Sequence, residues 1–533
     1  MGRHSKRPSA RVLAARNSVT VAGWTLVSRI TGLVRLAAIG ATLGPTYFAN
    51  TFATTNTLPN TVYSAIAGQA LALVIVPAVV RAIARAGVGE AGVLLGRVAG
   101  FLLVASGTIA LLVMVGAPGF AWVLTLGIED VVSRQQAQHA TVVLVLLVAP
   151  QIVLYTIAAL GAAAQQAQRR FALASAAPAV ENVVLVATLV AVSAVYGTGH
   201  EVGAVPAGLL LLLGVGSTLA VAVHAALQVW GAARVGLLVR PSFRWRSDPE
   251  AMEVVRQLRG SISIPVAPAA AHMVLLLLAA TVPGGVVVLQ LAYAVYVAPT
   301  ALGARAVSTV VLPGMSAAAQ SGDRTGFAAQ WRLALSYAAI AGLPPLCLLA
   351  VFARPVAEVL AVGELQAESF VDQLAACVTV VAVAQLVAGL HEIGRQALFA
   401  RKEIGTPRVA SLVSLAVTVL VGSSSLLVDD AGRLVVLSAA LLAGDLVAAG
   451  TVITRLRAVL TPEPLADRRR IAVAIAAAVA MLPVAWAGWW ALRVIGVDGP
   501  GDLGLLAGCA LLALATYGIA LHTGARTMVG RAR

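Results

Sequence analysis

Charged residues and cysteine are both scarce in this chain of 533 residues. Only 11% of the residues are charged, whereas a soluble globular domain carries about 25%. Hydrophobic residues make up 60% of the chain and the mean hydropathy is +0.92, which excludes a soluble globule. The three cysteines lie inside apolar runs and lack the spacing of a disulfide framework or a metal site. The composition therefore predicts an all-α polytopic membrane protein.

Acidic residues are scarce as well, with 22 Asp and Glu against 37 Lys and Arg and a formal net charge of +15. The basic residues occur in short clusters between apolar runs. This distribution is typical of membrane topology and not of a nucleic-acid groove. No nucleic-acid partner is expected.

Patterns of chemical catalysis are missing too. The chain shows no nucleophile and base pattern, no phosphate-binding glycine loop and no set of metal ligands. We therefore expect a protein without a cofactor and not an enzyme. If the chain is a transporter, its energy would come from an ion gradient or the membrane potential, with a possible coupling cation of unknown identity.

What the chain has in abundance is long apolar runs. A window of about 20 residues predicts about fourteen membrane-spanning helices. They are expected at 18–43, 47–80, 98–122, 139–164, 172–196, 205–230, 261–282, 286–313, 333–353, 373–400, 408–428, 434–454, 471–492 and 504–522. With this count, most Lys and Arg residues fall in loops on one side, as the positive-inside rule requires, and both termini are cytoplasmic.

The largest inward loop divides the chain into two halves. It spans 231–260, and apolar residues at Met252, Val254, Val255 and Leu258 among charges predict an interfacial helix in it. Two halves of six helices are an arrangement common in secondary transporters, with the site between them at mid-membrane. The expected regions are a basic cytoplasmic tail at 1–17, an N-lobe at 18–230, the loop at 231–260, a C-lobe at 261–457, two further spans within 458–523 and a cytoplasmic tail at 524–533.

Two arginines, Arg29 and Arg35, lie near the middle of the first span. A guanidinium at this depth costs roughly 3 kcal/mol or more, and an intramembrane charge usually faces a wet functional cavity. Six residues correspond to about 120° around a helix, so one wide polar sector can hold both arginines. Gly32 and Gly40 are candidate hinges, because glycine lets a helix bend where the charge sits.

Three acids inside predicted spans are candidates for coupling or gating: Glu181, Glu392 and Asp445. Glu181 could counter an arginine, bind a coupling cation or lie at a helix end. Arg395 is expected to extend toward the cytoplasmic Arg401, which leaves Glu392 as the candidate in its span. His224 and His272 are expected to be packed or interface histidines.

A series of short motifs extends over about the first 460 residues. They are S-R-I-T-G-L-V-R at Ser28 to Arg35, L-P-N at Leu58 to Asn60, V-P at Val76 and Pro77, R-F with A-P and Asn at Arg170, Phe171, Ala177, Pro178 and Asn182, L-P at Leu312 and Pro313, and F-x-R-x-x-x-x-T-P at Phe399, Arg401, Thr406 and Pro407. In this order the motifs resemble those of the MurJ/MviN lipid II flippases of the multidrug/oligosaccharidyl-lipid/polysaccharide exporter superfamily.

The resemblance implies two six-helix lobes around a central cationic cavity, plus two extra carboxy-terminal helices. It also implies that Arg29 and Arg35 hold the diphosphate of a polyprenyl-linked glycan, since arginine forks pair with phosphate oxygens. Asn50, Asn60 and Arg305 are further candidate substrate-binding residues. Arg305 is expected about three turns beyond Ala294 in the eighth span.

The chain departs from the family pattern at two basic positions. Tyr63 and Ala294 occupy places where the family often has a basic residue, and Asn50 replaces a usual acid. The cationic set is thus reduced. This leaves three alternatives open: a lipid II flippase, an exporter of another polyprenyl-linked glycan or lipid, and a non-transporting paralogue that acts as a scaffold in envelope synthesis.

The leading hypothesis is a lipid II flippase working by alternating access in the bacterial cytoplasmic membrane. Its expected partners are a lipid-linked anionic glycan, membrane lipids and possible cell-wall synthesis proteins.

Overall fold

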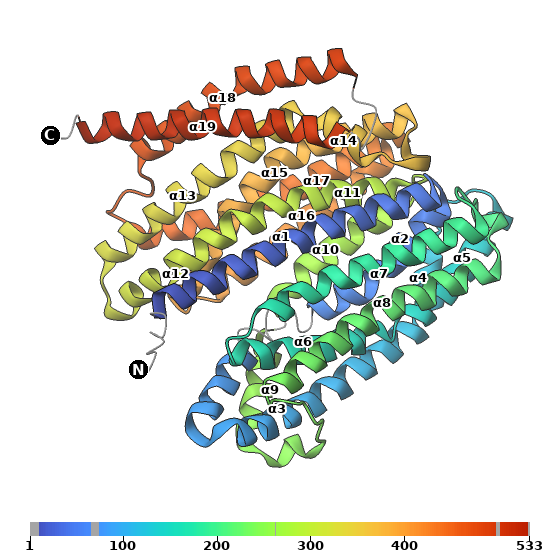
Figure 1. Ribbon diagram of the computed structural model, residues 1–533, viewed down its shortest axis with the longest axis horizontal. Coiled ribbons are helices and arrows are strands. Elements are labelled where there is room, and N and C mark those ends of the chain that lie inside the picture. Colours follow the sequence, from blue (N-terminus) through green and yellow to red (C-terminus); the bar gives the residue numbers. More distant parts are fainter. Residues whose placement is uncertain (1–9, 66–73, 262, 497–501, 531–533) are drawn as a thin grey trace, which may run out of the picture. The chain divides into compact units, whose positions relative to one another are not determined.

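The computed structural model describes residues 10–65, 74–261, 263–496 and 502–530. These residues form helices joined by short connections, with no strand among them (Figure 1). Within these ranges, 11 helices are long and apolar enough to cross a membrane, and Pro265–Ala279 and Gly285–Ala301 are shorter apolar helices. The predicted all-α multi-pass class is confirmed. The count of about fourteen spans stays a prediction.

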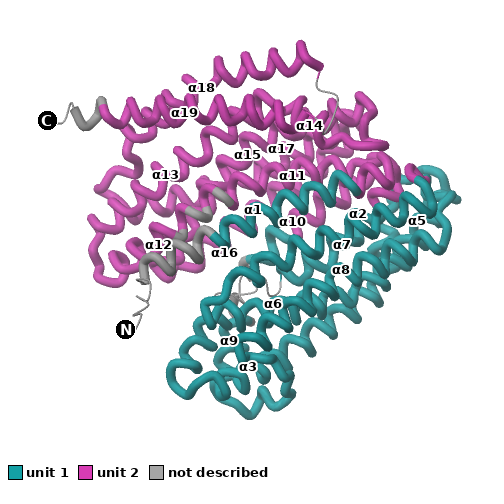
Figure 2. The backbone as a smooth tube through the Cα atoms, in the orientation of Figure 1, with its two compact units in different colours: residues 1–38, 51–197, 201–269 teal, residues 39–50, 198–200, 270–533 magenta. Residues whose placement is uncertain are grey.

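The chain forms two compact units (Figure 2). Unit 1 comprises 1–38, 51–197 and 201–269, and unit 2 comprises 39–50, 198–200 and 270–533. The units thus divide near the end of the predicted inter-lobe loop. The hairpin at 39–50 is grouped with unit 2, which the sequence did not predict.

Three helices contribute to both units, namely α1 (Ala10–Leu43), α2 (Tyr47–Tyr63) and α10 (Ser263–Ala279). The other helices of unit 1 are, in chain order, α3 (Val76–Val115), α4 (Ala117–Leu124), α5 (Val131–Val148), α6 (Gln151–Ala167), α7 (Ala172–Tyr196), the 3₁₀ turn η3 (Val202–Ala204), α8 (Ala207–Arg234), the 3₁₀ turn η4 (Arg244–Ser247) and α9 (Pro249–Ser261). Helix α8 packs against both α6 and α7.

Helix α3 differs from the sequence prediction. We expected a cytoplasmic loop between 81 and 97, but the chain stays helical on both sides of a kink at Gly87, whose φ is 85°. Glycine adopts this backbone conformation without the steric penalty that a side chain would bring. Helix α3 therefore carries its basic residues on a bent helix and not on a loop.

The predicted amphipathic helix of the inter-lobe loop exists as α9. Its buried residues Val254 and Leu258 join a core cluster with α3, while Met252 stays exposed. The preceding loop crosses α3 closely, since a Cβ at Gly96 would lie 2.3 Å from the Arg240 carbonyl oxygen. The apolar face of α9 is thus covered by α3.

An ion pair between Arg97 of α3 and Asp248 fixes the start of α9. Burial raises the pKa of Asp248, but hydrogen bonds from Arg97 and from the backbone N–H groups of Ala251 and Glu250 outweigh it, so the pKa lies below its ordinary value. A carboxyl group with a lowered pKa stabilises the fold above its unfolded pKa of about 3.9, and this contribution is lost as the pH falls through the folded value.

We therefore expect Asp248→Asn to increase the opening of α9 about fivefold at neutral pH, or about 1 kcal/mol for a half-exposed pair. The difference from the wild type should disappear as the pH falls below about 4. Hydrogen exchange of the α9 amides, compared between wild type and variant at each pH, measures this. A difference that persists unchanged in acid would contradict the ion-pair account.

Unit 2 contains the remaining helices. They are α11 (Gly285–Leu302), α12 (Ala304–Ser321), α13 (Arg324–Val351), α14 (Ala353–Leu360), the 3₁₀ turn η5 (Gly363–Leu365), α15 (Glu368–Ala400), α16 (Gly405–Ser424), the 3₁₀ turn η6 (Ser425–Leu427), α17 (Asp430–Leu460), α18 (Arg468–Ile495) and α19 (Leu503–Gly530). Asp323, Asp429 and Asp467 precede α13, α17 and α18, and each side chain accepts a backbone N–H of the first turn. Such caps satisfy donors that a helix start leaves unpaired.

The last two helices, α18 and α19, pack along each other (Figure 1). Together with Phe352 they form a separate core cluster of unit 2 that includes Met481 and Tyr517. These helices occupy the predicted thirteenth and fourteenth spans. Much of their apolar surface is exposed, as in Trp486 and Leu512, which is typical of membrane helices that face lipid.

Asn50, in the first turn of α2, ties the 39–50 hairpin to the turn between α10 and α11. Its amide nitrogen donates to the carbonyl oxygens of Ala280 and Val282 at 3.2 and 2.7 Å, and its oxygen accepts from the Val286 N–H at 3.0 Å. The side chain is 2% exposed. The amide thus satisfies three backbone groups of this turn.

Removing this amide should destabilise the protein strongly. Asn50→Ala removes the side-chain partner of three buried backbone groups, of which the Val282 oxygen keeps a hydrogen bond from the Gly285 N–H. We therefore expect a loss of about 2 to 4 kcal/mol in unfolding free energy. Denaturant unfolding in detergent measures the effect, with Asn56→Ala on the same helix as the control. Equal losses in the two variants would contradict this role for Asn50.

Candidate functional site

Arg35 of α1 faces an acid on α7 within unit 1. Its Nη1 atom lies 4.0 Å from Oε1 of Glu181, and its side chain is 25% exposed. The Arg35 Nε atom is buried and has no hydrogen-bond partner among the described residues. The charge that seemed costly in the sequence is thus balanced by Glu181, although at a distance that leaves donors of the guanidinium unused.

Glu181 is buried among three ionisable side chains. Its Oε1 accepts a 2.7 Å hydrogen bond from the Tyr155 hydroxyl of α6, and its Oε2 lies 2.6 Å from Nδ1 of His224 on α8. Only 8% of the Glu181 side chain is exposed. We call Arg35, Tyr155, Glu181 and His224 the Glu181 cluster. It joins α1, α6, α7 and α8 at one point.

The neighbours of His224 define its tautomer. The Gln228 amide is oriented because its nitrogen donates to the Ala174 carbonyl oxygen at 3.1 Å and its oxygen accepts from Gln165 at 2.7 Å. The same nitrogen lies 3.4 Å from Nε2 of His224. Because a donor faces Nε2, we assign the tautomer in which Nε2 carries the lone pair and Nδ1–H donates to the Glu181 carboxylate.

A proline in α7 leaves one backbone carbonyl oxygen without its usual helical donor, and Gln228 supplies a donor to it. Pro178 lies inside α7, and proline has no N–H to donate to the carbonyl four residues earlier. That carbonyl belongs to Ala174, and Gln228 takes the place of the missing donor. The proline thus leaves the Ala174 carbonyl oxygen available to orient Gln228, which lies one turn after His224 on α8.

Asn182 links α7 back to α1 beside Arg35. Its amide nitrogen donates to the Ser28 carbonyl oxygen at 3.3 Å and to the Thr31 hydroxyl at 3.1 Å. Gly32 faces this amide, and an added Cβ would lie 3.5 Å from it. Helix α1 is continuous through Gly32 and Gly40, so the hinge role of these glycines stays a prediction.

Helix α2 adds an aromatic side to the cluster. Tyr63 stacks on Tyr155 with ring centroids 5.8 Å apart. Asn60, nearly one turn earlier on α2, is exposed, and its role in substrate binding stays a prediction. Tyr63 is one of the positions where the family pattern often has a basic residue. An aromatic ring at this place supports Tyr155 instead of adding a charge.

The other predicted substrate-binding residues lie elsewhere. Arg29, six residues before Arg35 on α1, is exposed. Asn50 belongs to unit 2, where its amide holds the turn described above. Arg305 is at the start of α12, beyond a break at Gly303, so it does not continue the helix of Ala294 as expected, and its side chain lies outside the described part. Substrate contacts by these residues stay predictions.

The two other predicted acids lie in unit 2, in separate places. Asp445 of α17 accepts a 2.7 Å hydrogen bond from the Tyr296 hydroxyl of α11. Glu392 of α15 pairs with Arg395 one turn later. Arg395 is only 8% exposed, and Glu392 on its own helix balances its charge. Its guanidinium also lies 5.9 Å from the centroid of the Phe399 ring, one turn closer to Arg401. The expectation that it extends toward the cytoplasm stays a prediction.

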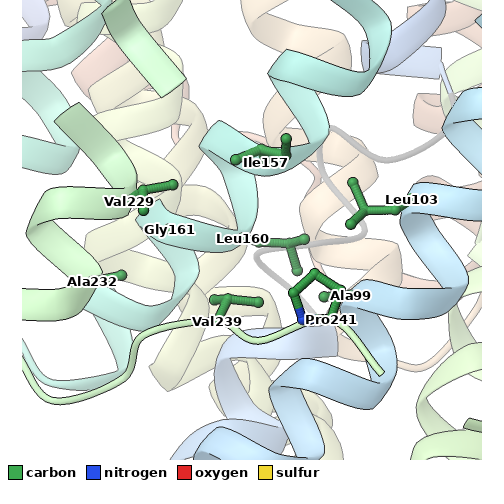
Figure 3. A pocket seen from close by; sticks show the side chains of 9 residues that line it. All are labelled: Ala99, Leu103, Ile157, Leu160, Gly161, Val229, Ala232, Val239 and Pro241. Carbon is green, nitrogen blue, oxygen red and sulfur yellow. The ribbon is translucent and has the colours of Figure 1, made fainter. Parts of the chain in front are cut away.

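A small cavity lies apart from these charges in unit 1 (Figure 3). Its volume is about 120 Å³, and α3, α6, α8 and the loop before η4 line it with apolar side chains, among them Leu103, Ile157 and Val229. A charged headgroup would lose its hydration there without compensation. Within the described ranges, no group of three or more His, Cys, Asp or Glu residues could hold a metal ion.

Sequence reasoning found Arg35 and Glu181 but missed most of their neighbours. Tyr155 and Gln228 drew no attention, and His224 was expected only to pack. An available signal was the four-residue spacing of His224 and Gln228, which places two polar side chains on one face of an otherwise apolar helix.

The comparisons with known proteins agree with this architecture. A family model described as "Lipid II flippase MurJ" matches residues 39–498. None of the curated protein sequences compared with the chain matches it.

Among solved structures, the chain is similar to "Lipid II flippase MurJ, inward closed conformation", with a TM-score of 0.72 and 15% identity over 96% of this chain and 100% of that one. It is also similar to an inward-facing multidrug resistance MATE family transporter of the MOP superfamily, with a TM-score of 0.64 and 13% identity over 82% and 96% of the two chains. A MOP superfamily transporter from Pyrococcus furiosus gives a TM-score of 0.54 and 15% identity over 83% and 95%. At these identities the likeness shows a shared fold.

Proposed function

Because the chain belongs to the MurJ lipid II flippase family, we propose that it moves lipid II across the bacterial cytoplasmic membrane by alternating access, with Arg35 holding the diphosphate. The observation that carries the role of Arg35 is its contact with Glu181. The Arg35 guanidinium lies 4.0 Å from its counter-ion, and its buried Nε has no hydrogen-bond partner in the part of the chain that the structure describes. It therefore keeps donors available for another anion.

Arginine suits this ligand for physical reasons. Its planar fork pairs with phosphate oxygens through two parallel hydrogen bonds and keeps its charge in an apolar environment. Arg29 lies on the same helix and would add a second contact to the diphosphate. The prenyl chain stays in the lipid phase and requires no polar site.

We place the protein in the cytoplasmic membrane as a multi-pass transporter with both termini in the cytoplasm. Moving a lipid across the membrane breaks no covalent bond, so no catalytic group is needed. An ion gradient or the membrane potential would drive the cycle, and envelope-synthesis proteins would act on the product.

Depletion with complementation tests this function. In a strain depleted of its own lipid II flippase, the wild-type chain should restore outward-facing lipid II and viability. An unchanged accumulation of inward-facing lipid II, with the chain present in the membrane, would contradict the proposal. Rescue of a different polyprenyl-linked glycan instead would favour the wider exporter alternative.

A further inference from the structure

We propose that Glu181 is a built-in substitute for the substrate anion, and that the Glu181–His224 pair takes up one proton when a diphosphate binds to Arg35. This inference rests on the proposed function, because it assigns a second role to the same site. It concerns binding equilibria and not the energy source of transport.

The first step of the argument is the cost of Arg35. An unpaired guanidinium inside a membrane-spanning unit is unfavourable by several kcal/mol. Glu181 removes this cost when no substrate is present, since its carboxylate lies on the neighbouring helix at 4.0 Å. A diphosphate that binds to Arg35 supplies the same neutralisation, and Glu181 then becomes a surplus negative charge.

The second step is how loosely Glu181 is paired with Arg35. Its two oxygens have close partners at 2.7 and 2.6 Å in Tyr155 and His224, whereas Arg35 is at 4.0 Å. Tyr155 of α6 and His224 of α8 therefore hold Glu181 in position when Arg35 binds an external anion. Arg35 can therefore separate from Glu181 while Glu181 keeps its hydrogen bonds with Tyr155 and His224.

The third step is where a proton can enter. Among the residues that the structure describes, the ionisable groups that face Glu181 are Arg35 of α1, Tyr155 of α6 and His224 of α8. Tyr63 of α2 stacks on Tyr155. The arginine is already charged, and the tyrosine hydroxyl already donates a hydrogen bond to Glu181. Among the described residues, Nε2 of His224 contacts the Gln228 amide nitrogen at 3.4 Å, a long hydrogen bond that leaves the lone pair weakly engaged.

A proton from solvent that binds at Nε2 makes His224 an imidazolium, and its Nδ1–H still donates to Glu181. Turning the Gln228 oxygen toward the new N–H gives His224 an acceptor in exchange for the present Gln228 bonds to Ala174 and Gln165. The pair then changes from a net charge of −1 to zero, so the surplus charge disappears when the diphosphate arrives. By linkage, the anion must bind more tightly where the pair is protonated.

The test measures binding and proton uptake together. Purified full-length protein in nanodiscs is titrated with lipid II between about pH 5.5 and 8.5, the range in which histidines titrate, and a pH indicator in weak buffer counts protons. The diphosphate diester of lipid II does not titrate in this range. We expect uptake of up to one proton per lipid II, and an affinity that rises by up to about tenfold per pH unit as the pH falls.

His224→Gln should make the affinity independent of pH, because glutamine retains a donor to Glu181 but cannot titrate. His139→Gln, an exposed histidine of the same unit, is the matched control and should behave as the wild type. Affinity without proton uptake in the wild type, or a full pH dependence in His224→Gln, would overturn this inference and leave the proposed function intact. No binding of lipid II at any pH would overturn the proposed function itself.

Discussion

Replacing Arg35 by alanine is expected to lower the affinity for lipid II by at least about a hundredfold and to abolish complementation. Charge-assisted hydrogen bonds contribute about 1.5 to 3 kcal/mol each, and a paired guanidinium and phosphate makes two of them. Arg35→Lys should recover only part of the affinity, because an ammonium group cannot form the paired fork.

Arg408→Ala is the matched control for this variant. Arg408 is an exposed arginine of α16, so its removal changes the net charge equally but should leave lipid II binding and complementation unaffected. Equilibrium binding in nanodiscs and the ratio of outward-facing to inward-facing lipid II in a depleted strain measure the two effects. An Arg35→Ala protein that binds and flips as the wild type does would refute the assigned role.

The second large effect is expected on stability, in Glu181→Leu. This change removes the counter-ion of Arg35 and the acceptor of both Tyr155 and His224. Breaking one side of a buried ion pair costs about 3 to 5 kcal/mol, and the partial exposure of Arg35 brings our expectation to about 3 kcal/mol. Denaturant unfolding in detergent would show it as a lowered midpoint.

A second substitution separates charge from packing. Adding Arg35→Leu to Glu181→Leu removes the uncompensated guanidinium and should restore part of the lost stability, as a double-mutant cycle would reveal. Glu129→Leu, at an exposed position of the same unit, should have little effect. Additive losses in the double variant would mean that Arg35 and Glu181 do not interact.

The cost of charge in an apolar environment made part of this site predictable. Arg35 and Glu181 stand out in a chain with few charges, and both lie in the Glu181 cluster. Their pairing depends on how α1 and α7 are rotated and aligned against each other, which hydropathy does not record. Tyr155 and Gln228 stayed hidden because neutral polar residues are common in membrane helices.

The fold, like the site, could be predicted only in part from the sequence. Hydropathy located most helices, and the apolar runs near 205–230, 408–428 and 471–492 correspond to α8, α16 and α18. It failed where helices bend or break within apolar or mixed segments, as at Gly87 of α3 and at Gly303 between α11 and α12. Such breaks follow from backbone conformation at single glycines, and average hydropathy does not change there.

The most direct test of the central claim is the affinity of Glu181→Gln for lipid II, measured with and without Arg35→Ala at one pH. Glutamine keeps hydrogen-bonding contact with Tyr155 and His224 but gives up the charge that competes with the substrate for Arg35. We predict that Glu181→Gln binds lipid II several-fold more tightly than the wild type, and that this gain vanishes when Arg35 is alanine. Weaker binding by Glu181→Gln, or an equal gain in the absence of Arg35, would contradict the account.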